Sequence, residues 1–213
     1  MKLVFFGPPG AGKGTQAAKL SETMGILAIS TGHIIRQAMA DGTPVGKIAE
    51  GYMKTGSLLP DDVVTALVAE RLKSDDCQKG YILDGFPRTL VQAEMMDETG
   101  IEVERVIDIE VPDEAIVKRM AGRRVCGVCG AAFHVEFNPP KQENVCDTCG
   151  AALSIREDDV PEVVLNRLSI YHEQTEPLKA YYQTKNKLVV IDGEGSVEDI
   201  FNQIQKATLS EAE

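Results

Sequence analysis

A glycine-rich turn near the start of the chain has the composition of a phosphate-binding loop. Residues 7–15 read Gly-Pro-Pro-Gly-Ala-Gly-Lys-Gly-Thr, which places a lysine at position 13 and a threonine at position 15. Glycines let successive backbone N–H groups point at a polyphosphate, a following helix presents its positive N-terminal end to the same anion, and lysine adds a full charge. The pattern therefore predicts that the phosphates of a nucleotide are held by Gly10, Ala11, Gly12, Lys13, Gly14 and Thr15.

The elements that must position this loop are present on both sides of it. The apolar run from Leu3 to Phe6 has the length of a buried strand, and residues 16–20 continue from the loop as a good helix former. In the general pattern a hydroxyl residue directly follows the lysine, whereas here Gly14 intervenes and the hydroxyl comes at Thr15. This shift indicates a subclass of the phosphate-binding loops.

Short apolar, β-branched runs alternate with helical periodicity along the chain. This alternation predicts an α/β fold of the P-loop NTPase type, with a five-stranded parallel sheet flanked by helices. The expected strands are Lys2–Phe6, Leu27–Ile29, Tyr81–Asp84, Val106–Val111 and Leu188–Ile191. Ligands of such sheets bind at the carboxyl ends of the strands, so Asp84 is expected to face the loop, where an acid can hold magnesium or its water shell.

Two segments interrupt the alternation and are expected to form lobes over the cleft. Residues 30–59 have helical character, whereas residues 122–159 hold no good helix and contain four of the five cysteines. The remaining ranges, 1–29, 60–121 and 160–213, are expected to build one core, so that the chain forms a single domain with two lobes.

The cysteine pairs of the second lobe have the spacing of a structural metal site. Cys126 and Cys129 form one Cys-x-x-Cys knuckle, Cys146 and Cys149 form another, and sixteen residues separate the two. This is the spacing of a four-cysteine zinc ribbon, and a lobe too small for its own core needs such a metal. Four thiolates also accept iron or cobalt, and two disulfides are the alternative, which a reducing cytosol disfavours.

Two further residues compete for a metal role. His134 lies between the knuckles, so an exchange with one cysteine stays open, but four cysteines already complete a tetrahedral site. Cys77 lies far away in sequence and is expected to be a small buried residue.

Composition bounds the class of protein. The 213 residues carry 22 basic and 33 acidic side chains, a net charge of −11, which argues against a nucleic-acid-binding surface. The first apolar run ends after four residues, and no stretch has the length of a membrane span. We therefore expect a cytoplasmic protein without nucleic-acid or membrane partners. We also expect a monomer, although composition does not determine the oligomeric state.

Four separate motifs resemble those of the nucleoside monophosphate kinases, and of the adenylate kinase family in particular. They are Gly12-Lys13-Gly14-Thr15, Ser30-Thr31-Gly32 with Arg36, Asp84-Gly85-Phe86-Pro87-Arg88, and Gly122-Arg123-Arg124. The resemblance covers essentially the whole chain. It implies a magnesium-dependent, reversible phosphoryl transfer from ATP to AMP that gives two ADP, with 30–59 as the NMP-binding lobe, 122–159 as a lid, and closure of both lobes over the nucleotides.

The resemblance also implies roles for individual side chains, and phosphoryl transfer itself calls for arginines that neutralise the spreading charge. The expected catalytic set is Lys13, Arg36, Asp84, Arg88, Arg123, Arg156 and Arg167. The resemblance further places ATP on the loop and on Arg119, Arg123, Ala132, Phe133 and Gly195. It places AMP on Thr31, Arg36, Ser57, Leu58, Leu59, Gly85, Phe86, Pro87, Arg88, Gln92, Arg156 and Arg167.

The chain departs from the family pattern at two places, and rival functions stay open. His33 stands where the family usually has an acid, and Phe133 stands where a tyrosine is frequent. A UMP or CMP kinase would share the loop and arginines but usually has a shorter second lobe. A nucleotide-dependent switch would not need the acceptor segment 84–88, and a nucleic-acid-binding ribbon would need a basic, aromatic face.

Overall fold

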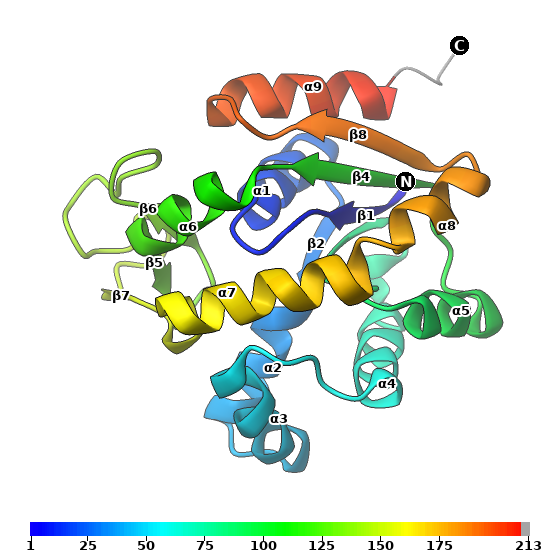
Figure 1. Ribbon diagram of the computed structural model, residues 1–213, viewed down its shortest axis with the longest axis horizontal. Coiled ribbons are helices and arrows are strands. Elements are labelled where there is room, and N and C mark those ends of the chain that lie inside the picture. The colour runs from blue at the N-terminus through cyan, green and yellow to red at the C-terminus, as the bar shows by residue number, and fades with distance from the viewer. Residues whose placement is uncertain (210–213) are drawn as a thin grey trace.

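Five parallel strands form the central sheet of the molecule (Figure 1). The structure is a computed structural model, and it describes residues 1–209. The strand order across the sheet is β2-β3-β1-β4-β8. The strands span β1 Lys2–Phe6, β2 Leu27–Ser30, β3 Tyr81–Asp84, β4 Arg105–Glu110 and β8 Leu188–Asp192. The predicted α/β class and parallel sheet are confirmed, and the strand bounds differ by at most one residue at either end.

Alternating side chains of the strands build two cores, one on each face of the sheet. Leu3 and Phe5 belong to one buried cluster, whereas Val4 and Phe6 belong to the other, as the twofold period of a strand requires. The first cluster includes side chains of four helices: α1 Lys13–Met24, α6 Asp113–Gly122, α7 Pro161–Ile170 and α9 Val197–Leu209. The second includes side chains of α4 Asp61–Leu72, α5 Leu90–Thr99 and α8 Leu178–Thr184.

Residues 30–59 form a helical lobe beside the carboxyl end of β2, made of α2 Thr31–Ala40 and α3 Pro44–Thr55. The two helices cross closely at Gly46, where a Cβ atom would lie only 2.0 Å from the carbonyl oxygen of Ala38. The lobe also contacts α7, because Asn166 Nδ2 donates a 2.8 Å hydrogen bond to the carbonyl of Thr55.

Residues 122–159 form a small antiparallel sheet that projects from one end of the molecule (Figure 1). Its strand order is β6-β5-β7, with bounds β5 Arg123–Cys126, β6 Ala132–His134 and β7 Leu153–Ser154. Three short helical segments complete the described chain: the 3-10 turns η1 Asp75–Cys77 and η2 Glu157–Asp159, and the π-helical η3 Tyr171–Thr175 that continues α7. Within residues 1–209, no helix combines the length and the apolar character needed to cross a bilayer.

Candidate active site

A cleft of about 1850 Å³ lies at the carboxyl ends of β1, β2 and β3. The sheet register places Asp84 beside both Phe5 and Ser30, so the segments that follow these strands meet in one place. The cleft wall contains nearly all the site residues expected from the sequence: Gly10, Ala11, Gly12, Lys13, Gly14, Thr15, Thr31, Arg36, Ser57, Leu58, Leu59, Asp84, Gly85, Pro87, Arg88, Gln92, Arg119, Arg123, Ala132, Phe133, Arg156, Arg167 and Gly195.

Among the residues expected to bind ATP or AMP, Phe86 is the one that does not line the cleft. Its side chain is fully buried in the hydrophobic cluster that α4, α5 and α8 share. Its neighbours Gly85 and Pro87 do reach the cleft wall. The Phe86 side chain therefore packs beneath the cleft, and the expected contact between this residue and AMP stays a prediction.

The glycine-rich loop connects β1 to α1, and Lys13 is the first residue of that helix. Gly12, just before it, has φ +96°, a left-handed conformation that favours glycine. Lys13 Nζ donates 2.7 Å hydrogen bonds to the carbonyls of Gly7 and Pro8. Burial lowers the pKa of Lys13 to about 8, although the nearby charge of Asp84 acts in the opposite direction. A bound phosphate would raise the pKa of Lys13 and so oppose the effect of burial.

Asp84 is the last residue of β3 and faces the start of α1. Its Oδ2 atom lies 3.4 Å from the position that a Cβ atom on Gly14 would take, and both Asp84 and Thr15 line the cleft. A carboxylate and a hydroxyl beside a phosphate loop are oxygen ligands, which Mg²⁺ prefers, so these residues fit the metal that the family resemblance implies.

Three arginines of the lid and α7 are held by two neighbouring aspartates. Arg123 Nε donates a 2.7 Å hydrogen bond to Asp159, and Arg156 Nε donates one of 2.8 Å to Asp158. Arg167 lies within ion-pair distance of both carboxylates, at 3.1 Å and 3.3 Å. Although burial acts to raise the pKa of Asp158, its arginine partners lower it well below the ordinary value.

Asp158 and Asp159 were missed by the sequence reasoning. They could have been predicted as partners of the arginines. An acidic run directly follows Arg156, and the expected reaction requires several arginines close together in the cleft. Such arginines repel one another unless carboxylates lie between them. The pairing therefore orients three cations in the cleft.

Arg36 and Arg88 remain without an ion-pair partner among residues 1–209, and both line the cleft. Burial is the largest cause that lowers the pKa of Arg36, to about 10, and the neighbouring charge of Arg156 acts in the same direction. Burial likewise lowers the pKa of Arg167 to about 9. Cations in such surroundings are stabilised by an anion, and a planar guanidinium can grip two phosphate oxygens at once.

The segment after β3 is held in place by its own backbone contacts. Thr31 Oγ1 donates a 2.8 Å hydrogen bond to the carbonyl of Gly85, and Arg88 Nε donates one of 2.9 Å to the same oxygen. From the π-helical segment, Thr175 Oγ1 donates to the carbonyl of Arg88 at 2.8 Å. No pattern in the sequence indicated this contact from Thr175.

His33, the first departure from the family pattern, lies at the edge of the cleft between two lobes. Its Nδ1 atom is 2.8 Å from the position that a Cβ atom on Gly130 of the lid would take. Burial, together with the charge of Arg36, lowers the pKa of His33 and so favours its neutral form. A group that tends to be neutral therefore stands where the family usually has an acid. On another wall of the cleft, Arg119 Nη2 donates a 2.7 Å hydrogen bond to the carbonyl of Gly193.

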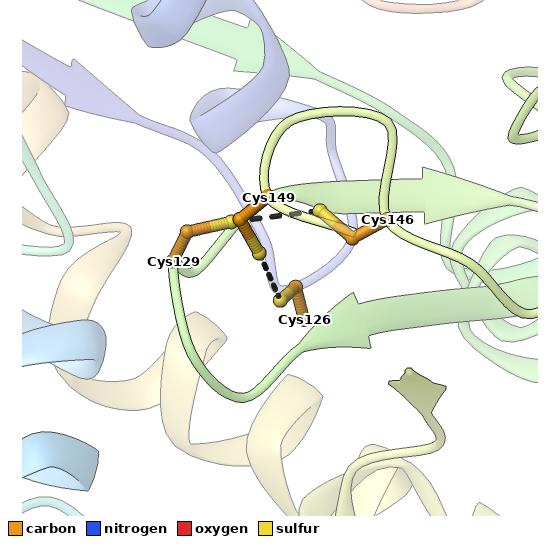
Figure 2. A group of neighbouring side chains, drawn as sticks. All are labelled: Cys126, Cys129, Cys146 and Cys149. Atoms are coloured by element: carbon orange, nitrogen blue, oxygen red, sulfur yellow. Dashed lines mark hydrogen bonds between the residues drawn. The ribbon is translucent and has the colours of Figure 1, made fainter. Parts of the chain in front are cut away.

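The four lid cysteines converge on one point (Figure 2). The sulfurs of Cys126, Cys129, Cys146 and Cys149 all lie within 4.8 Å of one another. Zn–S bonds of about 2.3 Å in a tetrahedron separate the sulfurs by about 3.8 Å. Two sulfur pairs lie at 3.4 Å and 3.5 Å. The cluster therefore fits a four-cysteine, zinc-type lid.

The alternatives for these cysteines receive no support from the structure. All five cysteines are free, His134 is not a member of the cluster, and Cys77 is buried elsewhere, as expected. The thiols differ in pKa. Although burial raises the pKa of Cys146, hydrogen bonds from the amides of Cys149 and Thr148 contribute to lowering it to about 6, whereas the pKa values of Cys129 and Cys149 are raised.

Parallel strands, a phosphate loop at their carboxyl ends and an arginine-lined cleft together define the class of P-loop phosphotransferases. The profile of the adenylate kinase family matches residues 5–187. The chain therefore belongs to the adenylate kinase family, whose enzymes transfer a phosphoryl group to a phosphate acceptor.

Curated relatives agree over nearly the full chain. An adenylate kinase of Carboxydothermus hydrogenoformans is 53% identical over 211 residues, which is 97% of this chain and 99% of the relative. An adenylate kinase of Thermoanaerobacter sp. is 51% identical, with 97% of both chains covered. One of Archaeoglobus fulgidus is 50% identical over 96% of both chains.

Proposed function

We propose that this enzyme transfers the terminal phosphoryl group of ATP to AMP and thereby forms two ADP. The observation that carries the proposal is that two separate sets of phosphate ligands open into one cleft: the loop with Lys13, and the arginines Arg36 and Arg88. A hydrolytic switch needs the first set alone. A site with both sets can hold two phosphorylated nucleotides together.

The proposed step breaks the bond from the γ-phosphorus to the bridging oxygen of ATP as a bond forms to a phosphate oxygen of AMP. Lys13 and the loop amides hold the donor, and Arg36 and Arg88 hold the acceptor phosphate. The three aspartate-held arginines, Arg123, Arg156 and Arg167, stabilise the charge on the transferring group. Positioning and charge neutralisation suffice for this chemistry, so no covalent enzyme intermediate is needed.

Asp84 and Thr15 are the residues that we propose hold magnesium, directly or through its waters. When bound there, the ion would supply positive charge that neutralises the phosphates. Because His33 stands where the family usually has an acid, we assign the protein's acidic contribution to Asp84.

Closure of residues 30–59 and 122–159 over the nucleotides is also part of the proposal. The contacts from Asn166 to Thr55 and from His33 to Gly130 support it, because they join the 30–59 lobe to α7 and to the lid. Closure would exclude water, which otherwise accepts the phosphoryl group and wastes ATP.

We propose that the lid cysteines hold one structural Zn²⁺, with iron or cobalt as the other metals that four thiolates accept. Four thiolates leave no position for a substrate, so the metal stabilises the lid.

On the donor side, Arg119, Ala132, Phe133 and Gly195 are proposed to contact ATP. On the acceptor side, the proposal retains Thr31, Ser57, Leu58, Leu59 and Gln92. We also propose that the enzyme is a cytoplasmic monomer that has no nucleic-acid or membrane partners.

A coupled assay that compares AMP, CMP, UMP and GMP as acceptors tests the function directly. We expect ADP formation to depend on an acceptor and to be fastest with AMP. Faster turnover with UMP or CMP would identify a pyrimidine nucleotide kinase instead. Slow ATP hydrolysis that no acceptor accelerates would indicate a nucleotide-dependent switch.

A further inference from the structure

The side-chain amide of Gln92 is held from both sides. Its Oε1 atom accepts a 2.7 Å hydrogen bond from the backbone N–H of Arg88, and its Nε2 atom donates one of 2.8 Å to Asp61 Oδ1. The same Asp61 oxygen accepts a 2.8 Å hydrogen bond from Thr89 Oγ1. Gln92 is nearly fully buried, with 2% of its surface exposed.

These contacts permit one orientation of the amide. A flipped amide would set its NH₂ group against the Arg88 N–H, a donor against a donor, and its oxygen against the Asp61 carboxylate, an acceptor against an acceptor. An unmade hydrogen bond is costly at a buried position. The Arg88 N–H and Asp61 therefore fix which end of the amide is the donor.

Gln92 keeps hydrogen-bonding capacity for a ligand in this orientation. Its Nε2 atom has a second hydrogen and its Oε1 atom a second lone pair, and the side chain lines the cleft. Asp61 does not line the cleft. Asp61 is the first residue of α4, and it contacts a residue of the cleft wall through its hydrogen bond from Gln92.

We propose that Asp61 is a positioning residue that makes the acceptor site selective for a 6-amino purine monophosphate over its 6-oxo counterpart. A 6-amino purine presents a donor at the exocyclic group and an acceptor at the adjacent ring nitrogen, whereas a 6-oxo purine presents the reverse order. An amide fixed in one orientation matches one order and opposes the other. This inference rests on the proposed function, because it concerns the acceptor of that reaction.

The test compares kcat/KM for AMP and for IMP, which has the same ring shape with the opposite hydrogen-bonding order. Asp61→Ala removes the acceptor that orients Gln92, whereas Asp61→Asn retains one carbonyl oxygen at that position. Asp62→Ala is the matched control, since Asp62 is an exposed acid in the same first turn of α4. KM for ATP and the melting temperature are measured for each variant, so that a change in α4 stability is separated from a change in selectivity.

We expect Asp61→Ala to lower the preference for AMP over IMP about tenfold, toward the value for Gln92→Ala, with KM for ATP unchanged. Asp61→Asn and Asp62→Ala should keep the wild-type preference. An unchanged preference in Asp61→Ala, with AMP still a substrate, would overturn this inference alone. A wild-type enzyme that does not phosphorylate AMP would instead overturn the proposed function and this inference with it.

Discussion

Arg123 donates two hydrogen bonds to the carboxylate of Asp159, which is fully buried beneath the cleft. The arginine is 17% exposed and the aspartate 0%. Asp159 also lies 3.3 Å from Arg167, so one carboxylate serves two cations that line the cleft. The unliganded site is therefore held together by a charge that competes with nucleotide phosphates for the same arginines.

Replacing this carboxylate should destabilise the unliganded enzyme and increase its response to nucleotides. Asp159→Ala leaves two buried cations without their shared partner, and breaking such a pair typically costs about 3–5 kcal/mol. A bound polyphosphate would restore the missing charge. We expect a lower melting temperature and a larger rise on adding ATP and AMP than in the wild type. Asp76→Ala is the control, since the Arg71–Asp76 pair is exposed to solvent and contributes little to stability. Equal effects of the two substitutions would contradict the prediction.

Lys13→Ala and Arg88→Ala should each lose activity by about 10²- to 10³-fold or more while the fold is retained. Each removes a charge whose interaction with phosphate strengthens in the transition state, so kcat should fall along with kcat/KM. Steady-state kinetics at saturating nucleotides, with circular dichroism for the fold, measure this. Near-normal turnover of Arg88→Ala at saturating AMP would show that the acceptor phosphate is placed wrongly.

ATP binding should take up protons near pH 8. The Lys13 ammonium has a pKa of about 8 in the unliganded cleft, so roughly half of it is neutral there, and an adjacent triphosphate raises that pKa and restores the proton. Uptake should therefore decrease as the pH falls toward 7, where Lys13 is already charged. Titration calorimetry in buffers of different ionisation enthalpy measures the uptake. A binding enthalpy at pH 8 that does not depend on the buffer would contradict it, and Lys13→Met should show no such uptake.

Purified enzyme should contain about one tightly bound metal per chain. Chelation should lower the melting temperature more than the activity at low temperature, because the four sulfurs join segments of the lid while the arginines contact the phosphates. Elemental analysis and thermal melts measure this. Cys77→Ser should keep the metal, since Cys77 is not part of the cluster. Anaerobically prepared protein without a transition metal, but with four titratable thiols besides Cys77, would contradict the prediction.

The parts that the sequence predicted best are those with local, periodic signals. Side chains of the run from Leu3 to Phe6 alternate between the two cores, and the loop after it needs glycines at fixed places. The strand and the loop can therefore both be recognised from the amino-acid sequence alone. Phe86 was placed in the site because it lies within a matching motif. Its direction is set by packing against α4, α5 and α8, which a motif does not encode.

The sequence by itself determined the α/β class, the phosphate loop and the two knuckles, since each is composed of short local patterns that can be recognised one at a time. Only the tertiary structure decided which charges meet. Asp61 reaches Gln92 across 31 positions, Asp159 reaches Arg123 across 36, and Thr175 reaches the backbone of Arg88 across 87. Hydrogen bonds and ion pairs act over a few ångströms in space and leave no periodic trace along the chain, so these partners become identifiable only after the core has brought their elements together.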